Sequence, residues 1–397
     1  MDRYAHITGW GAYAPPRIVT NEDLAHVVPT SDAWIQDRTG IRERRIADEG
    51  EYTSTMGIKA GRRALEVANL DPGRVELIIV ATSTPDYLMP ATACLVQDGL
   101  GATRAAAFDL NTACSGFVYA LSVGASMIRA GAYDNVLVIG TESMSRVMNW
   151  TDRTTCVLFG DGAGAVVLEA SDRPGGLLSF SLGSDGSGAD LLTVRLGTRL
   201  PLGVGALATG ETYMKMNGPE VFRFATRIMS QSTREVMARA GLGVADIDLI
   251  VPHQANTRIL QVAAKQLGLP LERIFSNLDR YGNTSAASVP IALVEAIGAG
   301  RIQAGDRVVM VGFGGGLTWG ACLLEWSVDP EGRTWPAWRR GVYWTRTRLA
   351  RARSLLHRAD RRLAALEDRL RRRDNLRVNG PPDPDTNGHA RPPAPDA

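Results

Sequence analysis

The sequence is poor in the residues and runs that mark several classes of protein. It has four cysteines in 397 residues and no CxxC pair, which argues against a zinc site and against a disulfide framework. Such a chain is typical of a reducing compartment. No apolar run approaches the roughly 20 residues of a membrane-spanning helix. The first residues show no basic region followed by an apolar segment, as a signal peptide would. We therefore expect a cytoplasmic protein.

Net charge is also small, but it is unevenly distributed. The whole chain carries +2, whereas residues 333–374 hold fourteen arginines against four acidic residues. The rest of the chain must therefore be acidic overall. Apart from this local charge, nothing in the sequence supports nucleic-acid binding, so we predict none.

What the sequence does contain is an internal repeat with an offset of 172 residues. Residues 63–80 align without gaps on 235–252, and 111–121 align on 283–293. Residues 134–140 align on 306–312 at the same offset. Helical segments alternate with β-branched strands in each copy, so each half is predicted to be an α/β unit. Two such units would face each other about a pseudo-twofold axis.

The two copies differ at the residues that can carry chemistry. Cys114 in the first copy corresponds to Ala286 in the second, and His253 in the second corresponds to Ala81 in the first. Asn283, close to Ala286, is an amide that can donate hydrogen bonds. An asymmetric set on a symmetric frame predicts one active site between the halves.

Each of these residues also has a structural interpretation. Cys114 follows a predicted strand, 106–110, and precedes a predicted helix, whose N-terminus would favour a nucleophilic thiolate. The alternative is a structural role, because buried cysteines are commonly structural. His253 could simply hydrogen-bond within the core. Asn283 stands in a turn-forming Gly-Asn-Thr-Ser run. The glycine-rich segment 313–320 is either a tight turn or a backbone N–H aimed at an oxyanion.

Taken together, the motifs resemble the β-ketoacyl-acyl-carrier-protein synthase III family of thiolase-like condensing enzymes. They are WIQDRTGIRERRIA (34–47), ACSGF around Cys114, TDRTTCVLFGDGAGA (151–165), VPHQANTRI (251–259), GNTSAASVP (282–290) and GFGGGLTWG (312–320). The resemblance covers residues 1 to about 326.

The resemblance implies an α/β, duplicated thiolase-like fold, with two βαβαβαββ-type halves in five αβαβα layers. We expect the half with the nucleophile at 1–172 and the half with His253 and Asn283 at 173–328. A basic amphipathic helical extension is predicted at 329–375, and a disordered tail at 376–397.

It also implies a decarboxylative Claisen condensation. Cys114 would take the acyl group from an acyl-CoA starter, with the N–H groups of Cys114 and Gly315 as the oxyanion hole. Malonyl-acyl carrier protein would then lose CO2 while His253 and Asn283 stabilise the enolate, shielded by Phe313. The CoA thioester is a substrate, so no cofactor and no metal are expected.

Further roles follow from the same motifs. The expected CoA-binding residues are Trp34, Arg38, Arg153, Gly218 and Asn256. The expected carrier-protein contacts are Gln254, Ala255, Asn256, Thr257 and Arg258. Met89 would reach the acyl pocket of a partner subunit in a homodimer, or else would only pack in the core.

Two other functions compete with this one. An acyltransferase of the same fold would move the acyl group to another acceptor without decarboxylation, but it has no need of both His253 and Asn283. A non-catalytic scaffold would not need the intact set. The sequence does not determine the starter acyl group. It also leaves open whether the pathway is fatty-acid initiation or a specialised lipid or polyketide pathway. Asn111, Thr112 and the C-terminal extension suggest the specialised pathway.

The extension itself has several interpretations. Leu349, Leu356, Leu363 and Leu370 recur every seven residues on a very basic predicted helix. An accessory helix that packs on the enzyme is the simplest interpretation. Adsorption to an anionic membrane surface and recruitment of an acidic carrier protein or partner enzyme are the alternatives.

Overall fold

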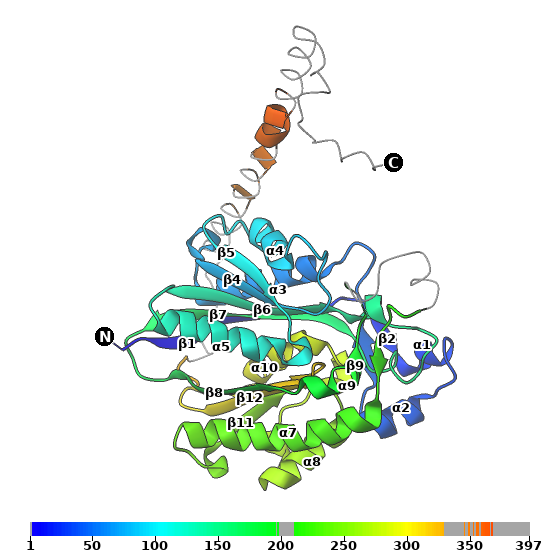
Figure 1. The fold of residues 1–397 in the computed structure, drawn as a ribbon. Helices are drawn as coiled ribbons and strands as arrows, with labels where there is room; N and C mark the ends of the chain where they lie inside the picture. Colours follow the sequence, from blue (N-terminus) through cyan, green and yellow to red (C-terminus); the bar gives the residue numbers. More distant parts are fainter. Residues whose placement is uncertain are drawn as a thin grey trace, which may run out of the picture.

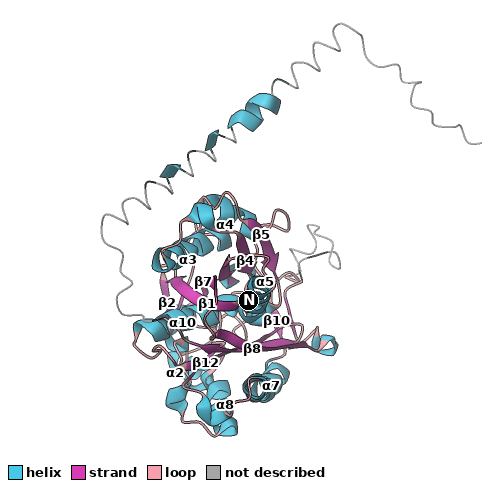
Figure 2. Cartoon of the chain, turned by 90° about the vertical axis from the view of Figure 1, so that its left-hand side faces the viewer, coloured by secondary structure: helices cyan, strands magenta, loops and turns pink. Residues whose placement is uncertain are grey.

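Two β-sheets, with helices between them and on both outer faces, make up the fold (Figures 1 and 2). The computed structural model describes residues 2–195, 197 and 210–328. Beyond these it describes 345, 348–349, 352, 355–356, 359–365 and 367. None of the described helices is both long and apolar enough to cross a membrane.

The first sheet has the order β1-β7-β6-β4-β5. Its strands are β1 (Tyr4–Tyr13), β7 (Asp161–Ser171), β6 (Asn135–Ser143), β4 (Leu77–Ala81) and β5 (Ala106–Leu110). β4 pairs in parallel with both β5 and β6, while β7 runs antiparallel to β6 and β1. β4 and β6 are buried along their whole length, as their continuous apolar sequences require.

The second sheet repeats this order as β8-β13-β12-β11. Its strands are β8 (Gly176–Ser184), β13 (Thr318–Glu325), β12 (Arg307–Gly314) and β11 (Leu249–Pro252). A single parallel bridge between Ile250 and Ile274 stands where the first sheet has β5. β4 and β11 begin 172 residues apart, as do β1 and β8. The structure therefore agrees with the repeat found in the sequence.

Helices complete five layers in the order αβαβα. The outer helices are α3 (Thr53–Ala68) and α4 (Thr92–Leu100) on the first sheet, and α7 (Gly218–Arg239) and α8 (Thr257–Leu267) on the second. The middle layer holds α5 (Gly116–Arg129) and α10 (Ser288–Gly298), which lie between the two sheets (Figure 1). Apolar side chains of α5 and α10 share one buried cluster with both sheets. The predicted thiolase-like α/β fold is thus confirmed.

Short elements close the end of the sheets where the site lies. They are β2 (Ile18–Thr20), α1 (Asn21–Ala25), α2 (Asp32–Thr39), β3 (Glu43–Arg45), β9 (Leu192–Thr193), β10 (Lys215–Met216) and α9 (Leu278–Tyr281). Ser31 caps the start of α2, and Gly40 ends it in a left-handed conformation (φ 83°). A Cβ at Gly40 would lie 2.0 Å from Oγ1 of Thr257, so glycine is required where α2 meets α8.

The end of the second sheet packs against the beginning of the chain. Trp326 follows β13, is 1% exposed and packs against Trp10 of β1 with the rings tilted by 57° and 5.2 Å between their centroids. The division predicted at residue 172 falls between β7 and β8, and these domain limits stay a prediction. Most of the predicted extension (329–375) and the whole tail (376–397) lie outside the described residues.

Candidate active site

Cys114 lies in a short turn between β5 and α5. This turn, Ala113–Ser115, is here named the Cys114 elbow. Ala113 has a left-handed backbone (φ 49°), which turns the chain sharply between strand and helix. Gly314, at the end of β12, approaches the elbow so closely that a Cβ there would lie 2.6 Å from the Cys114 nitrogen. Absence of a side chain at Gly314 therefore leaves room beside the Cys114 N–H.

Desolvation dominates the proton affinity of the Cys114 thiol. Burial raises the pKa of this thiol to about 12, while a hydrogen bond with the Ser285 side chain lowers it and the charge of Glu142 raises it. The sequence predicted that the helix N-terminus would favour a thiolate. In the structure Cys114 is only 5% exposed, and desolvation of this kind opposes the thiolate.

His253 follows β11 and is held from two sides. Its backbone N–H donates to the Val311 carbonyl (2.7 Å), and its Nδ1 lies 2.6 Å from the Ser288 hydroxyl. Burial lowers the pKa of His253 to about 3, so the imidazole is neutral at pH 7. The Phe313 ring meets the imidazole edge-on, with 5.1 Å between the centroids.

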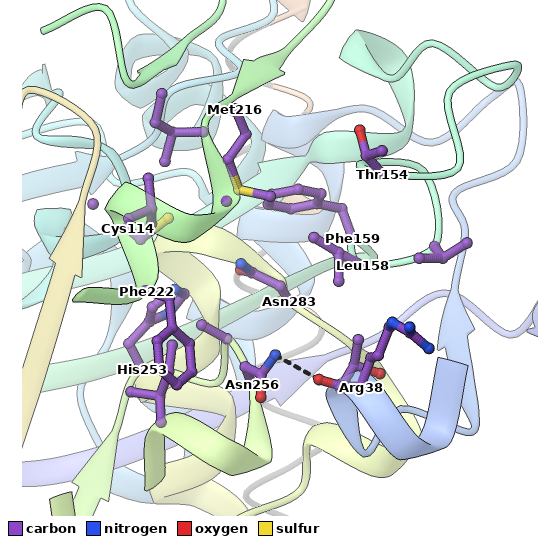
Figure 3. Close-up of a pocket in the computed structure, with 18 of the residues that line it drawn as sticks. Arg38, Cys114, Thr154, Leu158, Phe159, Met216, Phe222, His253, Asn256 and Asn283 are labelled. Atoms are coloured by element: carbon purple, nitrogen blue, oxygen red, sulfur yellow. Dashed lines mark hydrogen bonds between the residues drawn. The ribbon is translucent and has the colours of Figure 1, made fainter. Parts of the chain in front are cut away.

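Asn283 is fixed by the backbone around it. Its Oδ1 accepts a hydrogen bond from the Ser285 N–H (2.8 Å), and its own N–H donates to the Leu158 carbonyl (2.8 Å). With the amide oxygen engaged in this way, the NH2 group is left for the cavity. Figure 3 shows the Asn283 amide pointing toward the side of the cavity where Cys114 and His253 lie.

A cavity of about 370 Å³ joins these three side chains to the protein surface. Of the predicted site residues, it is lined by Cys114, His253, Asn283, Phe313, Trp34, Arg38, Arg153, Gly218, Ala255 and Asn256. Gly315 is absent from the lining, although the neighbouring Gly314 is part of it. Met89 is 87% exposed and does not line the cavity of its own chain.

The mouth of the cavity is aromatic and cationic. The guanidinium groups of Arg38 and Arg153 lie 4.5 Å and 5.0 Å from the centroid of the Trp34 ring. Arg153 also donates to the Pro29 carbonyl (2.8 Å). Asn256 donates from Nδ2 to the Arg38 carbonyl (2.8 Å), which ties the start of α8 to α2. An aromatic face with two guanidinium groups beside it suits a planar, anionic ligand, which can stack on the ring and pair with the charges.

The segment predicted to meet a carrier protein is only partly at the surface. Gln254 is 1% exposed and donates to the Pro252 carbonyl (2.8 Å), so its side chain is part of the interior. Thr257 packs beneath Gly40. Arg258 is exposed beside the mouth and pairs with Asp37 (3.0 Å).

Several residues of the site were not anticipated from the sequence. Ser288 hydrogen-bonds His253 through its hydroxyl, and Ser285 holds Asn283 through its backbone N–H. The Ser285 hydroxyl in turn donates to Glu142. Further cavity wall comes from Thr154, Leu158, Phe159, Leu192, Met216, Val221 and Phe222. Of these residues, the sequence repeat could have drawn attention to Glu142, because Glu142 aligns with the glycine Gly314 at the offset of 172. Over the described ranges, no group of three His, Cys, Asp or Glu side chains is placed to hold a metal ion.

A thiol, a neutral imidazole and an amide around one narrow cavity suit covalent acyl chemistry with stabilisation of a developing oxyanion. On a duplicated αβαβα fold, they define a thiolase-like condensing enzyme. Models of two families match the chain: "3-Oxoacyl-[acyl-carrier-protein (ACP)] synthase III" over residues 108–186 and its C-terminal counterpart over 237–326.

Individual relatives of this chain are enzymes of the same class. β-Ketoacyl-[acyl-carrier-protein] synthase III of Roseiflexus sp. (strain RS-1) is 56% identical over 328 residues, which are 82% of this chain and 100% of the relative. The crystal structure of 3-oxoacyl-[acyl-carrier-protein] synthase III from Aquifex aeolicus is 46% identical with a TM-score of 0.76, over 81% of this chain and 100% of that one. The priming β-ketosynthase of the R1128 polyketide pathway is 38% identical with a TM-score of 0.78, over 83% and 98%.

The chain therefore belongs to the β-ketoacyl-[acyl-carrier-protein] synthase III family, the condensing acyltransferases of fatty acid biosynthesis. The family expected from the motifs is confirmed. The Roseiflexus relative matches 328 of the 397 residues of this chain.

Proposed function

We propose that this chain condenses an acyl group from an acyl-CoA with malonyl-acyl carrier protein, using Cys114, His253 and Asn283. The observation that carries the proposal is the meeting of these three side chains in one cavity, although they come from the two different halves of the repeat. Cys114 is only 5% exposed, and the cavity connects it to exposed residues at the mouth, which suits a thioester carried on a long, thin arm.

In the first half-reaction, Cys114 attacks the acyl-CoA carbonyl, and CoA leaves as the thiol. The oxyanion is stabilised by the backbone N–H groups of Cys114 and Gly315. Support for this step comes from Gly314, which has no side chain and so leaves space beside the Cys114 N–H. The product is an acyl thioester on Cys114.

In the second half-reaction, the malonyl thioester replaces CoA and loses CO2. His253 and Asn283 donate hydrogen bonds to the enolate oxygen that develops. A hydrogen bond from Ser288 to Nδ1 of His253 would leave the proton on Nε2, and the Ser285 N–H leaves the Asn283 NH2 group free. The carbanion then attacks the acyl-Cys114 carbonyl, which releases the β-ketoacyl thioester and the Cys114 sulfur.

Phe313 and the aromatic mouth have supporting roles. The Phe313 ring lies edge-on to His253, where it excludes water from the carboxylate that is to leave. At the mouth, Trp34 stacks on the adenine of CoA, and Arg38 neutralises its phosphates. Arg153 has to move off the Trp34 ring before adenine can stack between them, because its guanidinium now lies 5.0 Å from that ring.

The carrier protein and a second subunit complete the proposal. Arg258 is exposed beside the mouth, where an acidic carrier protein would dock. Tyr87, Leu88 and Met89 are 60%, 92% and 87% exposed, an unusual run of apolar surface close to the exposed edge strand β5. We place this run in a homodimer interface, with Met89 entering the partner's acyl pocket.

Single-turnover assays with radiolabelled acyl-CoA test the assignment of roles. Cys114→Ala should accept no label and form no product. His253→Ala and Asn283→Ala should still take label onto Cys114 but lose condensation by at least about 100-fold. Condensation that persists in Cys114→Ala would overturn the proposal.

A further inference from the structure

Two segments that are far apart in the sequence build the mouth of the cavity. One is α2, which carries Trp34 and Arg38, and the other is the turn 151–158, which carries Arg153. Apolar side chains of both segments share one small buried cluster with a side chain of α1. In Figure 1, α1, α2 and β2 lie together at one side of the enzyme body. The shape of the mouth therefore depends on the contacts that join α2 to this turn.

A buried arginine on β3 lies where these segments meet. Arg44 is 0% exposed, and its guanidinium donates to the Val157 carbonyl of the turn (2.8 Å). The guanidinium also donates to the Val19 carbonyl of β2 (3.1 Å). A third hydrogen bond goes to Oδ1 of Asn21, the first residue of α1 (2.9 Å). One side chain thus fixes the turn 151–158 relative to β2 and α1.

The three acceptors around Arg44 are all neutral oxygens. Burial lowers the pKa of Arg44 to about 10, so the guanidinium still carries its charge at pH 7. A buried cation with uncharged partners is costly, because it loses its hydration without gaining a counter-charge. Stability alone therefore does not explain an arginine at this position. What the guanidinium supplies is a rigid fork of donors that reaches three segments at once.

Asn21 carries the connection on to α2. Its side chain is buried, and Nδ2 donates to Oδ1 of Asp32 (2.8 Å) and to the Ile41 carbonyl (2.8 Å). Asp32 is the first residue of α2, and Ile41 follows Gly40, which ends the helix. One amide group therefore holds both ends of α2. Arg44 fixes the orientation of that amide, since a guanidinium can only donate and has to face Oδ1.

We propose that Arg44 and Asn21 are positioning residues for the CoA thioester. Through them, α2 and the turn 151–158 keep a fixed relative position, so that Trp34 and Arg153 meet the adenine nucleotide together. The inference rests on the proposed binding of CoA at this mouth. Neither positioning side chain lines the cavity. Their contribution is a mouth that is already in shape, which lowers the ordering cost of binding.

The test compares two thioesters in single-turnover acylation of Cys114 on the full chain. The first is whichever of acetyl-, isobutyryl- and octanoyl-CoA acylates the wild type fastest. The second is the N-acetylcysteamine thioester of the same acyl group, which has no adenine nucleotide. Loss of the fixed mouth should weaken the reaction of the CoA thioester and spare that of the shorter one. Acylation does not require Asn283, so the readout is independent of condensation.

Two variants break the connection at different points. R44M removes all three donors and keeps an unbranched apolar stem. N21D keeps an acceptor for Arg44 and gives it a counter-charge, but it has no NH2 group and sets a carboxylate against Asp32. In both variants the half-saturating concentration of the acyl-CoA should rise about tenfold, because three residues of the mouth lose their placement. The limiting rate, and the rate with the N-acetylcysteamine thioester, should stay within about twofold of wild type.

Q36A is the matched control. Gln36 also donates to Asp32 (2.8 Å and 2.6 Å), but it lies within α2 itself, so its loss leaves α2 tied to Asn21. This variant should react with both thioesters as the wild type does. A tenfold rise for the acyl-CoA in Q36A as well would contradict a specific role of the connection through Asn21.

Equal losses with both thioesters would indicate general damage and overturn the proposal, as would unchanged acylation by the acyl-CoA. Should R44M fail to fold, N21D alone decides, since it preserves the hydrogen bond to Arg44. Trp34→Ala separates this inference from the proposed function. Wild-type affinity for the acyl-CoA in Trp34→Ala would mean that CoA does not bind at this mouth. A loss in Trp34→Ala without a loss in N21D would refute only the positioning role.

Discussion

Gly314→Ala is expected to abolish most of the catalysis while leaving the protein folded. A Cβ at this position would lie 2.6 Å from the Cys114 nitrogen, 3.1 Å from Cβ of Ala113 and 3.2 Å from Cβ of Cys114. All three atoms belong to the Cys114 elbow, so the elbow has to move. Overpacking of this kind costs about 1–3 kcal/mol of stability, which is small beside a typical total of about 5–15 kcal/mol.

The effect on rate should be much larger than the effect on folding. Displacement of one oxyanion donor lowers kcat by about 10²–10³. Single-turnover acylation of Cys114 measures the loss directly, and thermal unfolding shows whether the fold survives. Gly298→Ala is the matched control, because nothing lies within 4 Å of a Cβ at that helical position. Acylation within about threefold of wild type in a folded Gly314→Ala protein would refute the assignment of an oxyanion site beside Cys114.

Three further predictions follow from His253, Ser288 and Trp34. The pKa of His253 is lowered to about 3 in the folded chain, so the unfolded chain binds the extra proton first as pH falls below 6.5. The free energy of unfolding should therefore decrease by at most about 1.4 kcal/mol per pH unit below pH 6.5. Urea unfolding at pH 7 and pH 5 measures this slope in the wild type, and the slope should be smaller in His253→Gln. Ser288→Ala removes the partner of Nδ1 and should slow condensation about tenfold with acylation unchanged in stopped-flow assays. Trp34→Ala should raise the KM for acyl-CoA about fivefold, equal to about 1 kcal/mol of lost stacking, and an unchanged KM would place adenine elsewhere.

The sequence was sufficient to predict the fold and the positions of the three central side chains. Periodicity and the constant offset predicted two α/β units, and the exchanges at Cys114 and His253 predicted one site between them. The same offset contained the alignment of Glu142 with Gly314, but neither residue suggests a function until the structure shows what each one faces.

Other features depend on distances that no pattern in one chain reveals. Burial of Cys114 in the folded chain raises the pKa of its thiol, whereas the local sequence suggested only the influence of a helix N-terminus. Gln254 stands four residues before the exposed Arg258 in the same motif, yet its side chain is buried and donates to the Pro252 carbonyl. Met89 is 87% exposed and lies outside the cavity of its own chain, a placement that its apolar sequence context did not reveal.

The packing of Trp326 against Trp10 has a consequence for synthesis. β1 is translated first, but it needs β7 as its strand neighbour and Trp326 to cover Trp10. Contacts between such distant parts of a chain form late and slow the folding of a protein. Even after β7 has paired with β1, Trp10 stays without its Trp326 neighbour until nearly the whole enzyme body has left the ribosome. We expect chaperone dependence during expression to be greatest for chains that end before Trp326.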